Sequence, residues 1–428
     1  MSSSQKTFQI FIRPQQERTY FELPFSVPEN VCRMDLSYTY QRYEPEADPG
    51  PGSPPPREVN IIDLALRDST GNFIGASGAG RSQIHISATD SSAGYAKTAP
   101  LPGSWAVIVG AYKVAPAGVL VSYSVTFTFR ERTLLKGDPH VHSNASDGAF
   151  SREQLLAESK KIGLDFFFLT DHNNYAHNSP PMEYDHVCLF PGSEWTHYDG
   201  HAGMLGVCRP LRSPFCVNSA AGAWEKLDEA RQNGALVILN HPFCPTCGWH
   251  FGLEGHTFDL IEVWNGHTVP AGNQACLAWW HQQLCTGKRL PVIGGSDFHR
   301  ILPGLQLGSP TTAVYAMSRS MEDILAAMRQ GNCYLLAAPD GPDLWAEADG
   351  AILGETAAGG SCVTIRLSHL SGDETLRMIT DLGQEEAACP PRELTLSRAF
   401  PRAGFVRFEL RRGDQLILLS NPIYFQLT

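Results

Sequence analysis

Between residues 134 and 338, short apolar segments alternate with helix-like segments, and this alternation constrains the fold more than any other feature of the sequence. Apolar, strand-like segments are bounded by turns, and a Ser-x-x-Gln capping box starts the first helix at 151. We expect strands at 134–141, 165–170, 187–190, 203–208, 235–240, 260–264, 291–294 and 311–315. We expect helices at 151–162, 220–232, 273–285 and 321–329. Continuous apolar strands separated by helices indicate a parallel sheet covered on both faces, either open or closed.

The segments on either side of this α/β region have a β pattern. Residues 1–133 contain short alternating segments rich in Val, Ile, Thr and aromatics, as at 121–129, and predict a β-sandwich-like domain. The Pro-rich segment 44–58 predicts an exposed loop of that sandwich. Alternation returns at 362–367, 376–379, 405–410 and 415–419, which predicts a second, smaller β-sandwich-like domain. The sequence therefore predicts three domains, at 1–133, 134–338 and 339–428.

Composition narrows the class of protein. With 428 residues, 43% hydrophobic and 18% charged, the chain can build a large core. The 33 Lys and Arg against 44 Asp and Glu leave a net charge of −11, which argues against a nucleic-acid partner. We find no apolar segment of roughly 18–20 residues and no secretory signal, so we expect no membrane association. Eleven scattered cysteines are typical of reduced thiols, so we expect a cytoplasmic protein.

Histidines concentrate in the α/β region. Thirteen of the 15 His lie between His140 and His299, in short motifs that follow apolar segments. The motifs are GDPHVHSNASDG (137–148), LTDHNN (169–174), GSEWTH with GH (192–201), NHP (240–242) and GGSDFH (294–299). Residues i and i+2 of an extended chain point the same way, and the carboxyl ends of parallel strands share one edge of a sheet. We therefore expect these motifs to meet at one site.

Nine residues of these motifs are candidate metal ligands. They are His140, His142, Asp147, His172, Glu194, His201, His241, Asp297 and His299. Six imidazoles and three carboxylates exceed the four ligands of a tetrahedral zinc site. The set therefore predicts two or three divalent ions, of Mn, Fe or Zn, with Glu194 or Asp297 bridging.

Together the five motifs resemble those of the PHP (polymerase and histidinol phosphatase) domain, over about half of the chain. The flanking β domains and the motif EVWNG (262–266) are most similar to the CehA/McbA-type branch. The resemblance implies a distorted (β/α)7 TIM-like barrel with its metals at the C-terminal face. It implies three ion positions, held by His140, His142 and Asp297, by His201 and His241 with Glu194 bridging, and by Asp147, His172 and His299.

The resemblance also implies a hydrolase. We expect a phosphoesterase that acts on a small soluble phosphate ester, with a water bridging two ions as the nucleophile. A carbamate or carboxylic ester hydrolase of the CehA/McbA type is the alternative, and a non-catalytic metal-binding module is a third reading. A nuclease is disfavoured by the acidic balance. Whether the chain forms an oligomer stays open.

Several residues have predicted roles beyond ligation. Glu194, Asp297, His201, His299 and Arg300 are the candidate catalytic residues. His201 or His299 would protonate the leaving group, and Arg300 would hold a phosphate. Arg300 could equally be a surface residue, and Lys136 and Arg209 are further candidate cations. We expect Trp195, Glu262, Trp264 and Asn265 near the pocket, with core or solvated positions as the rival interpretation. We expect a plain loop at Cys244 and Cys247, because the sequence has neither the second C-x-x-C pair of a zinc ribbon nor the thioredoxin-like context of a redox motif.

Overall fold

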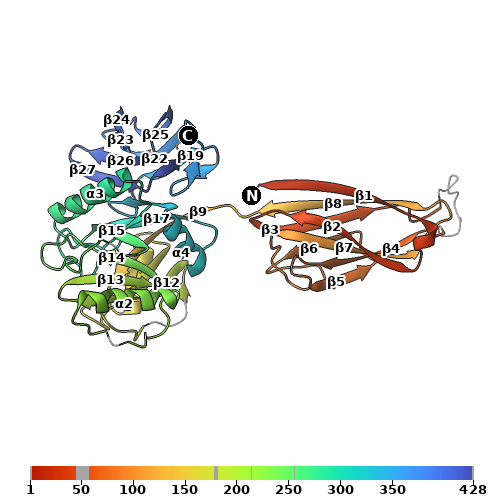
Figure 1. Ribbon diagram of the computed structural model, residues 1–428, viewed down its shortest axis with the longest axis horizontal. Coiled ribbons are helices and arrows are strands. Elements are labelled where there is room, and N and C mark those ends of the chain that lie inside the picture. Colours follow the sequence, from red (N-terminus) through yellow and green to blue (C-terminus); the bar gives the residue numbers. More distant parts are fainter. Residues whose placement is uncertain (1, 45–56, 178–181, 214, 255, 427–428) are drawn as a thin grey trace. The chain divides into compact units, whose positions relative to one another are not determined.

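The computed structural model describes residues 2–44, 57–177, 182–213, 215–254 and 256–426. Within them the chain divides into two compact units, Met1–Glu131 and Arg132–Thr428 (Figure 1). Most of the Pro-rich segment 44–58 lies outside the described residues. No helix in the described ranges is both long and apolar enough to cross a membrane.

The first unit consists of two four-stranded antiparallel sheets. One sheet contains β1 (Ser3–Ile12), β8 (Val119–Phe129), β3 (Val31–Thr39) and β6 (Gln83–Ser87), in that order. The other contains β2 (Thr19–Val27), β7 (Gly103–Lys113), β4 (Ile61–Arg67) and β5 (Phe73–Gly78), and a 3-10 turn at Pro14–Gln16 precedes β2. Alternate residues of β8, from Val121 to Phe127, are buried in a shared core with residues of the other sheet. This pattern is typical of a sandwich.

The second unit is organised around one long mixed sheet. Its main path runs, in order, through β16 (Val292–Gly295), β15 (Leu260–Asn265), β14 (Leu236–Asn240), β13 (Gly200–Leu205), β12 (Val187–His197), β10 (Phe166–Leu169), β9 (Thr133–Val141), β17 (Thr311–Ala316), β18 (Cys333–Leu336), β27 (Gln415–Ser420), β26 (Phe405–Arg412), β23 (Thr375–Thr380) and β24 (Gly383–Ala388). The short strands β11 (Met182–Tyr184), β21 (Thr356–Ala357) and β28 (Ile423–Phe425) pair beside this path. Most of these strands are apolar and buried, as expected for a sheet covered on both faces.

The sheet curls so that the residues after β16 reach β9. The Asp297 amide donates to the His140 carbonyl at 2.9 Å, and the His142 amide donates to the Phe298 carbonyl at 3.0 Å. Val141 and Phe298 form a parallel bridge. Strands far apart along the sheet path therefore meet at their carboxyl ends.

The expectation of a wholly parallel sheet is wrong at two strands. Strand β13 runs antiparallel to both β12 and β14, and β17 runs antiparallel to β9 and β18. Only two residues, Tyr198 and Asp199, separate β12 from β13, and a parallel crossover needs a dozen or more. Strand β17 follows β16 through a segment without an α-helix and begins at the edge where β16 ends.

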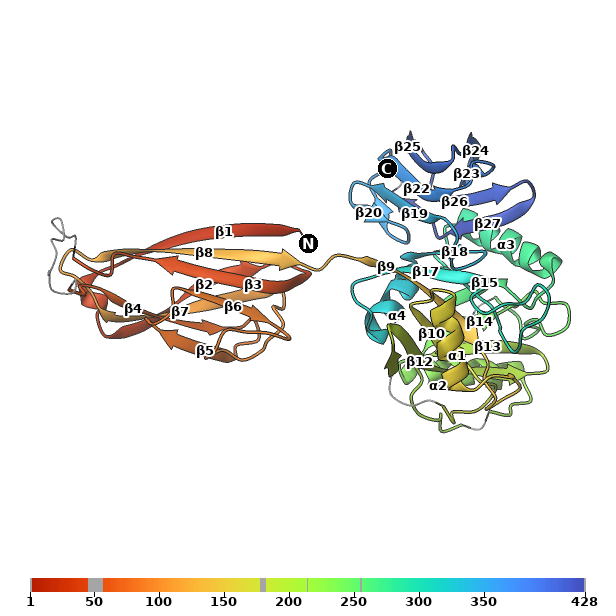
Figure 2. The same cartoon turned by 180° about the vertical axis from the view of Figure 1, so that it is seen from behind.

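Four α-helices pack on this sheet in the described part of the chain (Figure 2): α1 (Arg152–Lys161), α2 (Ala220–Gln232), α3 (Pro270–Cys285) and α4 (Met321–Gln330). The predicted capping box of α1 is present, since Ser151 Oγ accepts from the Gln154 amide and Gln154 Oε1 accepts from the Ser151 amide. A (β/α)7 barrel would have more helices than these four. The structure thus shows a mixed α/β fold with a curled sheet, and the complete barrel stays a prediction.

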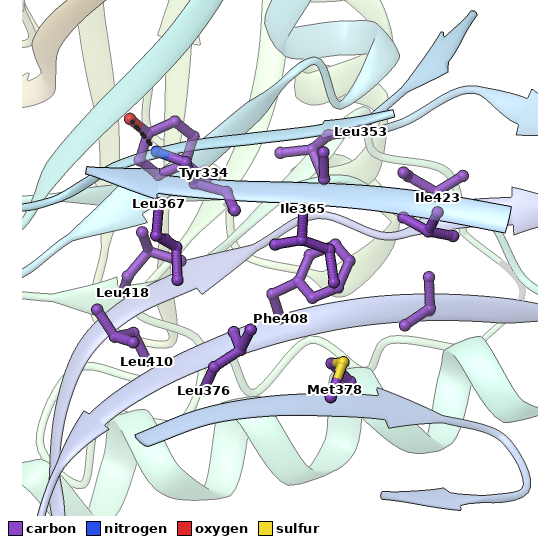
Figure 3. Close-up of a cluster of buried hydrophobic side chains, with 14 of the residues drawn as sticks. Tyr334, Leu353, Ile365, Leu367, Leu376, Met378, Phe408, Leu410, Leu418 and Ile423 are labelled. Atoms are coloured by element: carbon purple, nitrogen blue, oxygen red, sulfur yellow. Dashed lines mark hydrogen bonds between the residues drawn. The ribbon is translucent and has the colours of Figure 1, made fainter. Parts of the chain in front are cut away.

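The C-terminal strands continue the same sheet rather than standing apart from it. Strand β27 pairs with β18, and a second sheet of β20 (Ala351–Ile352), β19 (Asp343–Ala348), β22 (Cys362–Leu370) and β25 (Arg392–Ala399) packs over this extension. Figure 3 shows the core between them, where Ile365 of β22 lies near Phe408 of β26. Residues 339–428 therefore belong to the same compact unit as residues 132–338.

Candidate metal centre

All nine predicted ligands lie at one edge of the curled sheet. They come from the carboxyl ends of β9, β10, β12, β14 and β16 or the residues just after them, and from the beginning of β13. Because β13 is antiparallel to its neighbours, its beginning lies beside their ends, and His201 pairs with Thr196 and Asn240. We expected the ligands at the carboxyl ends of parallel strands. His201 lies at the beginning of β13 instead, and it reaches the same edge of the sheet because the hairpin reverses the direction of β13.

The first group of ligand atoms contains His140, His142, Glu194 and Asp297, all buried. The Nε2 atom of His140 lies 3.3 Å from Glu194 Oε1 and 3.3 Å from Asp297 Oδ1. The Nε2 atom of His142 lies 3.1 Å from Asp297 Oδ1 and 3.4 Å from Glu194 Oε2. Two imidazoles and two carboxylates thus converge on one point between β9, β12 and the residues after β16.

The second group shares Glu194 with the first. The Nδ1 atom of His201 lies 3.3 Å from Glu194 Oε1, and Nε2 of His241 lies 3.5 Å from the same oxygen. The other Glu194 oxygen faces His142 and His172. The carboxylate therefore stands between neighbouring groups, the position that a bridging ligand requires.

The third group contains Asp147, His172 and His299, beside His142. Asp147 Oδ1 lies 3.2 Å from Nε2 of His299 and 3.6 Å from Nε2 of His172. The Asp147 side chain is 58% exposed, whereas that of Glu194 is 1% exposed. This group is therefore the most accessible of the three to solvent.

Several of these ligand atoms are buried without a hydrogen-bond partner in the described structure. They are Nε2 of His140, both ring nitrogens of His142, Oε2 of Glu194 and Nδ1 of His201. Buried polar atoms are almost always bonded, so such a set needs a ligand. Mixed imidazole and carboxylate donors suit divalent Mn, Fe and Zn. The residues present therefore fit divalent metal ions.

Electrostatics favours the ionised carboxylates. Burial by itself would raise the pKa values of Glu194 and Asp297, but the surrounding histidines, His140 first, lower both well below their ordinary range. Burial lowers the pKa of His142 to about 4, so its imidazole is neutral near pH 7. Burial also opposes the charged form of His140, but Asp297, Glu262 and Glu194 raise its pKa well above its ordinary value. Ionised carboxylates are the form that metal binding requires.

Glu262 contacts two of the candidate ligands, His140 and His241, and orients them. This residue is buried, and its Oε1 lies 2.9 Å from Nδ1 of His140. Its Oε2 accepts from the His241 amide at 2.9 Å and from Asn265 Nδ2 at 3.0 Å. Since an ionised carboxylate only accepts, Nδ1 of His140 carries the proton and Nε2 faces the site. The sequence left open whether Glu262 and Asn265 lie near the pocket or in core or solvated positions. In the structure both lie at the site.

Sequence analysis missed two buried residues that hold the loops of the site. Asp138 accepts from the amides of Ser296 and Gly308 at 3.0 and 2.8 Å, which ties β9 to the loop after β16. Burial raises the pKa of Asp138 to about 6, although these hydrogen bonds oppose the rise. Asn240 donates to Glu194 Oε1 at 2.8 Å. The signals were present in the sequence, because Asp138 lies two residues before His140 and Asn240 directly precedes His241.

The predicted cations lie less centrally. Arg300 is exposed and donates to the Asp147 carbonyl at 3.0 Å, so it borders the third group. Lys136 donates to the Pro339 carbonyl at 3.0 Å and pairs with Asp343 at 2.9 Å, away from the ligands. Arg209 lies in an exposed segment after β13.

Two predicted pocket aromatics have different surroundings. Trp195 is buried and donates to the Phe215 carbonyl at 2.6 Å, which is a core position. Trp264 and Asn265 line a cavity of about 610 Å³, together with residues that include Leu277, Leu416 and Arg411. Asn265 Nδ2 also donates to Asp297 Oδ2 at 3.3 Å, but none of the nine predicted ligands is among the described residues that line this cavity.

Comparisons with known proteins find no matching family model and no matching curated protein. Solved structures that are similar to parts of the chain include the following three. A two-domain protein from Bacteroides vulgatus, described as containing a predicted PHP-like metal-dependent phosphoesterase, is 21% identical, with a TM-score of 0.40 over 68% of this chain and 96% of its own.

The other two structures match less of the chain. A protein from Bifidobacterium adolescentis described as a metal-dependent phosphoesterase is 15% identical over 38% of this chain and 87% of its own, with a TM-score of 0.27. An amidohydrolase from Chromobacterium violaceum is 16% identical over 47% of this chain and 98% of its own, with a TM-score of 0.28. All three TM-scores are below 0.5, so this likeness does not by itself assign the chain to a family.

Proposed function

We propose that the chain is a metal-dependent hydrolase of the PHP type, with a barrel-like catalytic region and two or three divalent ions at its metal centre. The observation that supports this most directly is the convergence of three ligand groups around Glu194, each with its ligand atoms within 4.8 Å of one another. Ions held by these groups would give partners to buried ligand atoms that have none in the described structure, such as Nε2 of His140 and Oε2 of Glu194. We propose Mn, Fe or Zn at each position.

The protein's own residues have distinct tasks in this proposal. Bound divalent ions would supply an acidified water and polarise the ester, as in other metal-dependent hydrolases. Glu194 would share its two oxygens between neighbouring ligand groups, and Glu262 orients the ring of His140. His201 directs Nδ1 at Glu194, so its Nε2 is the ring nitrogen that would protonate a leaving group. His299 has Nε2 near Asp147 and Nδ1 near the Asp297 carbonyl, and it suits a ligand role better.

We propose a small soluble phosphate ester as the substrate. Arg300 borders the third and most open group, where its guanidinium would meet a phosphate oxygen. The formal charge of −11 argues against nucleic acid, and we propose a cytoplasmic location for the chain. The same cluster serves either a phosphoester or an acyl ester, because both need an activated water and a stabilised oxyanion.

A carbamate or carboxylic ester hydrolase of the CehA/McbA type is the second candidate, and the scarcity of predicted cations beside the ligands favours it. Lys136 is held by Asp343 and the Pro339 carbonyl. Of the predicted cations, Arg300 is the one that lies beside the ligands.

The test compares two chromogenic substrates that share a leaving group, p-nitrophenyl phosphate and p-nitrophenyl acetate. The protein is loaded with Mn, Fe or Zn, and each assay has a chelator control. Turnover of the phosphate that the chelator abolishes supports the phosphoesterase, and Arg300→Ala should then raise KM for phosphate about tenfold. Metal-dependent turnover of the acetate alone supports the ester hydrolase. If metal-loaded protein turns over neither substrate, the proposed hydrolysis of simple esters is wrong.

A further inference from the structure

A pair of cysteines lies directly behind one of the candidate ligands. In the loop after β14, Cys247 Sγ lies 3.0 Å from Cys244 Sγ and 3.7 Å from Nδ1 of His241. Nε2 of the same imidazole faces Glu194 at 3.5 Å. The ring of His241 therefore has the metal centre on one side and a thiol pair on the other. The proposed function makes no use of this pair.

The backbone holds the two sulfurs together. The Cys244 amide donates to the His241 carbonyl at 2.8 Å, and the Gly248 amide donates to the Cys244 carbonyl at 3.0 Å. A side chain at Gly248 would meet the Cys244 carbonyl oxygen at 2.5 Å, so the turn requires glycine there. A disulfide bond needs a separation of about 2.05 Å, and side-chain rotation can close the remaining distance of roughly 1 Å.

The contact between Cys247 and His241 has a consequence for metal binding. A metal-bound histidine almost always gives its other ring N–H to an acceptor, which orients the ring and raises its basicity. In this structure Cys247 Sγ is the atom in that position. Forming a disulfide would pull Cys247 Sγ toward Cys244 and replace the thiol with a weaker acceptor. The support for His241 would then be reduced.

We propose that Cys244 and Cys247 form a reversible thiol–disulfide site that controls how firmly His241 holds a divalent ion. This inference rests on the proposed metal centre. Cys247 is a positioning residue, since it acts through His241.

The oxidant in this proposal is a small disulfide such as glutathione disulfide. The Cys244 sulfur attacks it, which forms a mixed disulfide and releases one glutathione thiol. Cys247 then attacks the Cys244 sulfur, which forms the Cys244–Cys247 bond and releases the second thiol. The two protein thiols lose two electrons and two protons, and these reduce the oxidant to two thiols. Excess reduced glutathione reverses both steps.

The experiment uses the full chain loaded with Mn²⁺, because thiolates bind manganese poorly and its loss reports the nitrogen and oxygen ligands. Glutathione disulfide is added, free thiols are alkylated, and the peptide that contains residues 244–247 is analysed by mass spectrometry. Release of Mn²⁺ to a chelator is followed by its paramagnetic resonance signal. We expect the peptide to lose two hydrogens and to resist alkylation. We expect Mn²⁺ release to be about 10-fold faster after oxidation.

Four variants separate the contributions. Cys244→Ala keeps the contact between Cys247 and His241, so we expect slow release that does not respond to the oxidant. Cys247→Ala removes the acceptor, so we expect fast release with or without oxidant. Cys247→Ser restores an acceptor without a thiol, so we expect slow release that ignores the oxidant. Cys285→Ala is the control at an exposed cysteine of α3, and it should respond as wild type does.

Two outcomes would overturn the proposal. One is alkylation of both Cys244 and Cys247 after exposure to the oxidant. The other is a disulfide that leaves the Mn²⁺ release rate unchanged. Neither readout uses a substrate, so a protein that forms the disulfide and releases Mn²⁺ but hydrolyses no ester would contradict only the proposed function.

Discussion

The unit Arg132–Thr428 contains two clusters of buried ionisable side chains, and the clusters differ in how their charges are satisfied. In the C-terminal strands, Glu409 receives hydrogen bonds on both oxygens, from Arg407 at 2.6 Å and from Arg411 at 2.8 Å. The Arg407 guanidinium also lies over the Trp280 ring, 5.4 Å from its centroid. This cluster neutralises its carboxylate with the protein's own donors.

The cluster around Glu194 is different. Its carboxylates and imidazoles face one another at 2.9–3.9 Å, and several of their atoms have no hydrogen bond in the described structure. Buried charge therefore does not by itself mark a functional site, because structural ion pairs are buried too. The informative feature is a set of unmatched ligand atoms that converge on one point.

The largest expected effect is the loss of a direct ligand. Mutation of a residue that hydrogen-bonds to a metal ligand typically lowers metal affinity or activity by about 10–100-fold. Loss of a ligand itself should cost more, so Asp297→Ala should lower the rate of hydrolysis by more than about 100-fold and reduce bound metal. His140→Ala should behave likewise. Rates and metal content measure the effect, and circular dichroism should show that the unit Met1–Glu131 keeps its β signal. The control is Asp228→Ala on an exposed turn of α2. Full activity in Asp297→Ala would refute the site.

The second prediction concerns the paired cluster. Glu409→Ala leaves Arg407 buried without its partner, so the free energy of unfolding should fall by about 3–5 kcal/mol while metal content in the folded protein stays normal. Denaturant unfolding measures the stability. The double variant Arg407→Met, Glu409→Leu removes both charges and should be nearly as stable as wild type. A loss of metal in folded Glu409→Ala would show that the two clusters are coupled.

A third prediction tests the support behind the metal ligands. Glu262→Gln weakens the acceptor of His140 Nδ1 and places an amide near the His241 amide, so metal affinity should fall about 10–100-fold. Competition with a fluorescent chelator measures the affinity. The exposed Glu393→Gln is the matched control, and it should leave the affinity unchanged. Equal affinities in both variants would mean that Glu262 has only a structural role.

The smallest effect is a pH dependence of the paired cluster. Burial would raise the pKa of Glu409, but Arg407 and Arg411 lower it below its ordinary value of 4.5. The unfolded chain then binds the proton more readily than the folded protein does. The stabilisation is therefore present above about pH 4.5 and is lost as the pH falls below it.

Metal-free protein and its Glu409→Gln variant provide the comparison. The difference in their unfolding free energies should shrink as the pH falls from roughly 7 to 4. Chemical denaturation at each pH measures this difference. A constant gap across the range would show that Glu409 is not the group that titrates.

The sequence predicted much of the second unit because its signals are local. The helix at 220–232 has the predicted bounds, and the capping box at Ser151 depends only on residues three apart. The strand directions were harder to predict. Antiparallel and parallel buried strands have the same apolar composition, so the strand directions depend on the connections. These are the short turn between β12 and β13 and the helix-free segment between β16 and β17.

The ligand types and their order along the chain were readable from the motifs alone. The spacing of His140 and His142 in an extended strand and the Asp-x-His of Asp297 and His299 are local facts. What only the tertiary structure decided is which of these atoms meet. The curl of the sheet brings the residues after β16 to β9, and Glu194 thereby stands between two groups. The contact of Cys247 with His241 and the burial of Glu262 also depend on long-range packing, which no local pattern specifies.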